Sequence, residues 1–214
     1  MASIHPPRPG EHPRATGQYH IVGPKVDALE EWELYVGPDG SLVLRADQQG
    51  VEFGQEVRRL GHVVVVGERV ERLQLHQRTP AGVHRQTYTV YEDGVLVTDN
   101  RTPGRRMVDA PSEALVVGPL ISLPLWLREE RGRRPVLWVY AAPTGLLASA
   151  VGHVEWTLAG YEELSSPMGT QHCARWDLLD PWGNRHAVWT TDQGRVVRWE
   201  QANWTASLVA WREE

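Results

Sequence analysis

Three histidines and one carboxylate in the C-terminal half of the chain could do chemistry. His153 and Glu155 are two residues apart, so in a strand their side chains share one face. His172 and His186 belong to two neighbouring predicted strands, and strand register could bring all four groups together as a zinc site or an acid–base pair. The compact spacings His-x-His and His-Glu-x-x-His are absent. We therefore favour the interpretation that these four residues are ordinary polar residues on a half-exposed sheet.

Other reactive groups are sparse. The single cysteine, Cys173, excludes an intrachain disulfide and a multi-cysteine metal site. It follows His172, but adjacent residues of a strand point to opposite faces, which excludes a Cys–His couple within the strand. No Gly-x-Ser-x-Gly, Ser-x-x-Lys, P-loop or Gly-x-Gly-x-x-Gly motif occurs. We predict no catalytic residue, metal or cofactor; the alternative is a hydrolase-like small-molecule enzyme that uses His153, Glu155, His172 and His186.

Tryptophan is the strongest functional clue, because ten occur and seven lie in the last third of the chain. Indole rings bury large areas and can line either a packed core or a ligand pocket. Both interpretations stay open. For the pocket, the candidate ligand-binding residues are five tryptophans and two arginines near the mouth: Trp126, Trp156, Trp176, Trp189, Trp199, Arg175 and Arg198.

The elements that must position these residues are short alternating segments separated by Gly, Pro, Asn and Asp, which is typical of antiparallel strands. We predict an all-β fold: one strongly curved antiparallel sheet, a half-barrel or incomplete barrel. Residues 1–16 are rich in proline and are expected to form a flexible arm, and residues 17–214 a single β domain. The terminal run Trp204–Trp211 is expected to be paired inside the sheet, because an exposed apolar edge invites aggregation.

Residues 114–127 form the most apolar stretch of the chain. Pro119 can start a short helix that places Leu120, Leu123 and Leu127 on one face. We predict a helical or coiled apolar plug inside the curve of the sheet, in preference to a lid over a ligand cavity.

Two parts of the chain carry a resemblance. The segments Gly17–Val22, Glu30–Leu34 and Pro38–Arg45 resemble opening hairpins, and Ala174–Asp177 with Ala187–Arg198 resembles closing strands, of one group of proteins. That group comprises bacterial proteins of unknown function built on a lipoprotein-carrier-like half-barrel. The resemblance implies a curved sheet around a short helical segment, with an apolar concavity that could hold an acyl chain.

Charge and composition narrow the class of partner. The net charge of −5 leaves no excess of basic residues for nucleic acid. No apolar run is long enough to span a membrane, and the N-terminus has no apolar signal region, so we expect a cytoplasmic protein. We predict a non-catalytic binding or carrier protein for a hydrophobic or amphipathic small molecule, such as a lipid or acyl chain. A monomer is favoured over a dimer.

Overall fold

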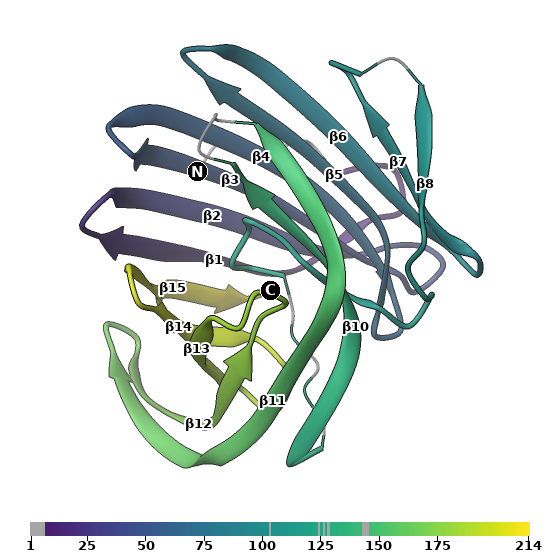
Figure 1. Ribbon diagram of the computed structural model, residues 1–214. Coiled ribbons are helices and arrows are strands. Elements are labelled where there is room, and N and C mark those ends of the chain that lie inside the picture. The colour runs from purple at the N-terminus through teal and green to yellow at the C-terminus, as the bar shows by residue number, and fades with distance from the viewer. Residues whose placement is uncertain (1–6, 103, 124, 126, 128, 143–145) are drawn as a thin grey trace.

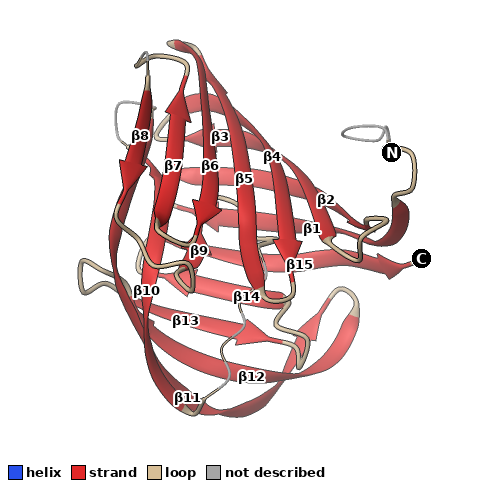
Figure 2. Ribbon diagram, turned by 90° about the vertical axis from the view of Figure 1, so that its right-hand side faces the viewer, coloured by secondary structure: helices blue, strands red, loops and turns tan. Residues whose placement is uncertain are grey.

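All regular structure in the described part of the chain is β-strand (Figures 1 and 2). The computed structural model describes residues 7–102, 104–123, 125, 127, 129–142 and 146–214. The fifteen strands are β1 (His12–Gly23), β2 (Val26–Val36), β3 (Leu42–Glu52), β4 (Gln55–Val66), β5 (Arg69–Thr79), β6 (Gly82–Tyr91), β7 (Gly94–Asp99), β8 (Arg105–Val108), β9 (Leu115–Val117), β10 (Arg131–Ala141), β11 (Leu147–Ser166), β12 (Gly169–Leu179), β13 (Arg185–Thr190), β14 (Val196–Gln201) and β15 (Trp204–Glu213). The predicted all-β class is confirmed.

The strands form one sheet in the order β8-β7-β6-β5-β4-β3-β2-β1-β15-β14-β13-β12-β11-β10-β9. Neighbours are antiparallel except β9 and β10, which run parallel. The two strands at the ends of this order, β8 and β9, are four and three residues long. Short edges limit the unpaired backbone that another chain could add to. The predicted curved, unclosed sheet is confirmed.

Figure 1 shows β10 and β11 crossing the concave side of β3–β6, so the sheet wraps around its own core. A hydrogen-bond network of His84, Gln86, Asp99 and the Leu147 backbone, which we call the latch, joins β11 to β6 and β7. The Leu147 N–H at the start of β11 donates to Nδ1 of His84 on β6 (2.8 Å), and Nε2 of His84 then donates to Asp99 of β7 (2.9 Å). Gln86 donates both to Asp99 (2.8 Å) and to the Leu147 carbonyl (3.3 Å). The latch holds the β10–β11 hairpin against β6 and β7.

The apolar segment after β8 fills the inside of the curve, as predicted, but it is not helical. Leu120, Ile121 and Leu123 belong to the main buried core. The predicted helix is wrong because the backbone bonds elsewhere: Leu125 N–H donates to the Gly194 carbonyl at 3.0 Å, where a helix would require the Ile121 carbonyl. Leu115–Val117 instead adds a short strand beside β10.

The two chain ends meet inside the sheet. β15 pairs with β14 on one side and β1 on the other, which confirms the predicted internal pairing of Trp204–Trp211. β1 begins at His12, so residues 12–16 of the predicted arm are part of the sheet. Just before it, the Glu11 carboxylate forms an ion pair with Arg45, and both side chains are almost fully buried. That pair anchors the start of β1 to β3.

No helix long and apolar enough to cross a membrane occurs among the described residues.

Candidate functional site

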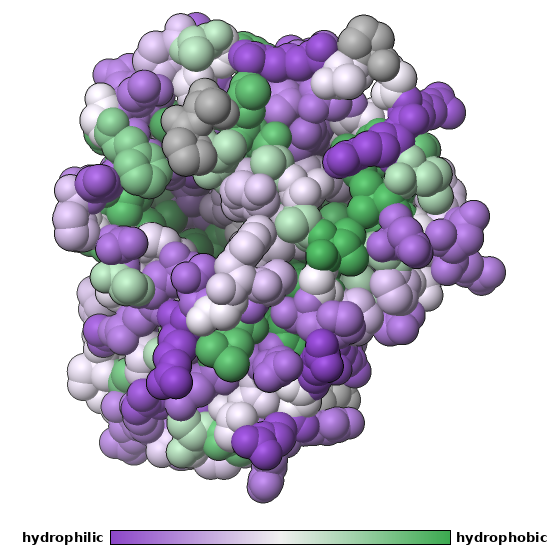
Figure 3. Space-filling view, viewed as in Figure 1, coloured by the Kyte–Doolittle hydropathy of each residue, from purple (hydrophilic) through white to green (hydrophobic). Residues whose placement is uncertain are grey.

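A cavity of about 420 Å³ opens where the turns of the β1–β2 and β3–β4 hairpins face β10 and the loop after β9. Figure 3 shows a hollow on this side of the molecule with hydrophobic residues inside it. The size falls in the range typical of small-molecule sites. Its apolar walls come from six strands and one loop: Ile21, Val26, Val117, Ile121, Trp138, Val139, Trp199 and Trp204.

The aromatic wall of the cavity is rigid. The Trp138 and Trp199 rings meet edge to face with centroids 6.4 Å apart, and Trp204 lies 6.1 Å from Trp199. The Trp199 indole N–H donates to Nδ1 of buried His186 (3.0 Å). Since Nδ1 accepts, the imidazole proton is on Nε2, which faces Asp180 at 3.4 Å. Burial lowers the pKa of His186, so this histidine stays neutral and holds the Trp199 ring in place.

The polar part of the cavity wall is internally neutralised. Arg59, Gln48 and Glu52 all line the cavity. The Arg59 guanidinium donates to both oxygens of Glu52, to the Gln48 side-chain carbonyl, and through Nε to Gln77 (2.6 Å). Because the charge of Arg59 is already matched by Glu52, this cluster does not call for a charged ligand group.

Glu30 fixes the loop that forms one wall. It is fully buried, and its carboxylate accepts from the backbone N–H groups of Ile121 (2.9 Å) and Ser122 (2.8 Å) and from Gln48 (3.1 Å). Gln48 also donates to the Pro119 carbonyl (3.0 Å). Burial raises the pKa of Glu30, while these hydrogen bonds oppose the rise. Glu30 on β2 and Gln48 on β3 thus hold residues 119–122 of the loop in place.

At the mouth of the cavity, Lys25 and Phe53 face each other from adjacent turns. The Lys25 ammonium lies 5.9 Å from the Phe53 ring centroid, and both residues are exposed. Among the described residues Lys25 forms no ion pair. It is therefore the cation available at this opening.

The structure brings few of the predicted ligand-binding residues to this cavity. Of the seven, Trp199 lines it, and Trp126 lies outside the described residues. Trp176 is in the main core and donates to Thr190 (2.9 Å). Trp189 packs instead with Cys173 and Val197 in a separate small cluster, where the Arg175 and Arg198 guanidinium carbons lie 5.4 and 5.6 Å from its ring centroid.

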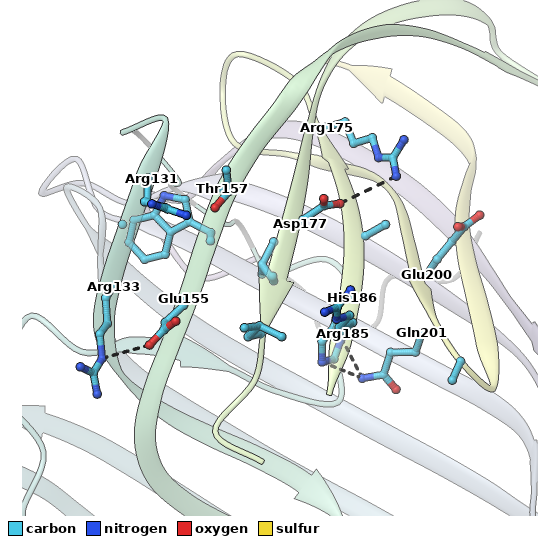
Figure 4. Close-up of a pocket in the computed structure, with 16 residues that line it drawn as sticks. Arg131, Arg133, Glu155, Thr157, Arg175, Asp177, Arg185, His186, Glu200 and Gln201 are labelled. Carbon is cyan, nitrogen blue, oxygen red and sulfur yellow. Dashed lines mark hydrogen bonds and ion pairs between the residues drawn. The ribbon is translucent and has the colours of Figure 1, made fainter. Parts of the chain in front are cut away.

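The last of the seven, Trp156, lines a second hollow of about 1080 Å³ over β10–β14, which Arg175 also lines (Figure 4). Its floor is the exposed face of the sheet, where arginines alternate with carboxylates. Arg133 pairs with Glu155 at 3.5 Å and Arg175 with Asp177 at 3.8 Å. Arg131 and Arg185 also line this open trough, and neither forms an ion pair with another described residue. We assign an amphipathic ligand to the smaller cavity instead, because its walls are apolar and aromatic.

The four residues of the predicted enzyme alternative do not all come together: Glu155 and His186 both line the second hollow, whereas His153 and His172 do not line it. His153 and His172 are exposed, and the His172 ring stacks on Tyr161 with centroids 5.6 Å apart. His186 is buried behind Trp199, and Glu155 is committed to Arg133. Within the described part of the chain no group of three or more His, Cys, Asp or Glu could hold a metal ion. Cys173 is buried, which raises the pKa of its thiol, and it behaves as a small apolar residue, as predicted.

The sequence did not reveal Trp138, Trp204, Lys25 and Phe53 as site residues. The only available signals were that Lys25 is the single lysine and Phe53 the single phenylalanine; the structure places both in turns between strands. That these turns lie together became visible only with the strand register.

Comparison with known proteins identifies the fold. The sequence matches no protein-family model and no curated protein. The structure is similar to a DUF1089 family protein from Pseudomonas aeruginosa, with a TM-score of 0.54 and 12% identity over 80% of this chain and 89% of that one. It is also similar to a β-barrel-like protein of DUF1849, a domain of unknown function, from Brucella abortus, with a TM-score of 0.57 and 6% identity over 94% and 98% of the two chains.

At such low identities the likeness shows a shared fold. The predicted resemblance to bacterial β-barrel-like proteins of unknown function is confirmed at that level. Neither of these structures is described as a lipoprotein carrier.

Proposed function

We propose that this chain binds a small amphipathic molecule, with an apolar chain inside the cavity of about 420 Å³ and an acidic group at Lys25. The observation that carries the proposal is the distribution of polarity along the cavity. Its interior is apolar and aromatic, its one buried cation is neutralised by Glu52, and at the mouth stands Lys25, which forms no ion pair with another described residue.

The physical argument is one of desolvation. An alkyl chain gains roughly 0.8 kcal/mol for each methylene that it buries, so contact with Trp138, Trp199 and Trp204 favours binding. A charged group carried into the interior would lose its hydration without finding an unpaired partner. An acidic group that stays at the mouth remains hydrated and can approach Lys25. Acyl carboxylates therefore fit better than neutral hydrocarbons or cationic amphiphiles.

Titration of the full chain with two monomeric amphiphiles of equal chain length, dodecanoate and dodecyltrimethylammonium, tests the proposal through tryptophan emission. We expect saturable binding of dodecanoate at one site and weaker binding of the cation. The substitution Lys25→Gln should weaken dodecanoate about two- to fivefold, the range of an exposed ion pair, and leave the cation unchanged or slightly improved.

Arg69→Gln is the matched control. Arg69 is a partly exposed cation of β5 that pairs with Glu71 at 3.2 Å and does not line the cavity. It should bind both amphiphiles as the unaltered protein does. Absence of saturable binding by either amphiphile would overturn the proposed function. An equal loss of affinity for dodecanoate in Lys25→Gln and Arg69→Gln would overturn the role of Lys25.

A further inference from the structure

Exposed apolar side chains gather next to the cavity mouth on the outer face of β1–β3. Val22 and Val51 are each opposite Asp27 in the strand register, so all three share one face, and Leu29 follows two residues later on that same face. Val22, Leu29 and Val51 are 47%, 44% and 44% exposed. With Phe53 at the next turn, these residues form what we call the rim patch.

Phe53 is held in solvent by an unusual backbone conformation. Its side chain is 70% exposed, and its φ of 52° is the only positive φ of a non-glycine residue in the described chain. Bulky residues rarely adopt this region, which glycine and asparagine tolerate. The Phe53 N–H donates to the Lys25 carbonyl (2.7 Å), which fixes the turn. A large apolar ring is thus displayed at the mouth where the turn itself favours a small or polar residue.

The charged groups around the rim patch are of both signs, with no excess of cations. Asp27 contacts His20 (2.9 Å), and Arg58 pairs with Asp47 (2.5 Å). Lys25 is cationic and Glu56 is an exposed carboxylate. The patch therefore has no excess of positive charge that would select an anionic surface, and its attraction to a partner must come from apolar burial.

We propose that the rim patch docks on a zwitterionic lipid bilayer, with Phe53 inserted, and that the ligand enters the cavity from that bilayer. This inference rests on the proposed function, because a poorly soluble amphipathic ligand is most concentrated in a lipid surface. The mouth opens beside the patch, so docking places the cavity against the bilayer. A lysine beside an aromatic ring suits this zone, where the ring enters the apolar layer and the ammonium stays among headgroups.

Sedimentation with phosphatidylcholine vesicles tests the docking. We expect the full chain to co-sediment, with a partition coefficient that changes less than twofold when phosphatidylglycerol is added. Phe53→Asn keeps a residue that tolerates the left-handed backbone and should lower partitioning about tenfold, the scale of one partly inserted ring. The double variant Val22→Thr/Val51→Thr should lower it by a similar factor.

Tyr161→Asn is the matched control, since Tyr161 is 65% exposed on β11 outside the patch and should partition unchanged. The double valine variant lies outside the cavity and should bind dodecanoate in solution normally, which separates docking from ligand binding. Equal partitioning of the unaltered chain and both patch variants overturns the docking alone. A dimer that dissociates in the patch variants overturns it too, because the patch would then be a face between two copies.

Discussion

The latch between β6, β7 and β11 makes a sharp test of how the fold holds the cavity. The Asp99 carboxylate receives three donors: the Arg101 N–H on Oδ1 (2.7 Å), and the side chains of His84 (2.9 Å) and Gln86 (2.8 Å) on Oδ2. In Asp99→Asn one oxygen becomes an NH₂ group, so in either amide orientation at least one donor faces another donor. His84 cannot adapt by changing tautomer, because its Nδ1 must accept the Leu147 N–H.

An unsatisfied buried donor costs about 1–3 kcal/mol, so Asp99→Asn should lower the free energy of unfolding by about that amount at pH 7. Hydrogen bonds from Arg101, Gln86 and His84 outweigh burial and lower the pKa of Asp99 from 3.8 to about 2. A lowered carboxyl pKa stabilises the fold above the unfolded-state value, and that stability is lost as the pH falls from about 4 toward 2. After allowance for solvent screening, this pH-dependent contribution of Asp99 to the free energy of unfolding amounts to about 1–2 kcal/mol.

Urea unfolding followed by tryptophan emission at pH 7 and pH 3 measures both effects. The acid-dependent loss should shrink in Asp99→Asn, because the titrating group is gone. Asp93→Asn, in the exposed β6–β7 turn, is the matched control and should unfold as the unaltered chain does. A stability of Asp99→Asn within about 0.5 kcal/mol of the unaltered protein at pH 7 would refute the reasoning.

Two further predictions concern other parts of the sheet. Truncation after Asn203 removes β15, which pairs on both sides, and should give insoluble protein; a soluble truncated chain with an unchanged melting temperature would contradict this. Glu30→Ala leaves the Ile121 and Ser122 N–H groups unpaired. It should lower the free energy of unfolding by about 2–4 kcal/mol, measured with urea, and should weaken dodecanoate binding. Glu31→Ala, on the opposite face of β2, should do neither.

The all-β class and the internal C-terminal strand could be predicted because alternation and turn residues are local signals. The prediction of a helix within residues 114–127 was wrong, because the leucine spacing and Pro119 of this segment also suit a helix. What decides against a helix is a tertiary hydrogen bond, from the Leu125 N–H to the Gly194 carbonyl. Local propensity cannot reveal a partner seventy residues away.

The site was harder to predict because it depends on register. Trp176 pairs with Val188, while Trp189 pairs with Arg175, so the two tryptophans face opposite sides of the sheet. A bulge between Trp189 and Thr190 shifts the alternation further along β13. Counting tryptophans indicated aromatic excess correctly, but which rings line the cavity depends on pairings and bulges that no single strand encodes.

Filling the cavity is the most direct test of the central claim. Val26 lines it and is only partly buried, so Val26→Trp can extend a ring into the space; Val66→Trp, 44% exposed at the end of β4 and outside the cavity, adds the same ring elsewhere. Dodecanoate binding should be measured by isothermal titration calorimetry for both variants and the unaltered chain. The account predicts one-site binding that is lost in Val26→Trp and retained in Val66→Trp, whereas equal binding by both variants would contradict it.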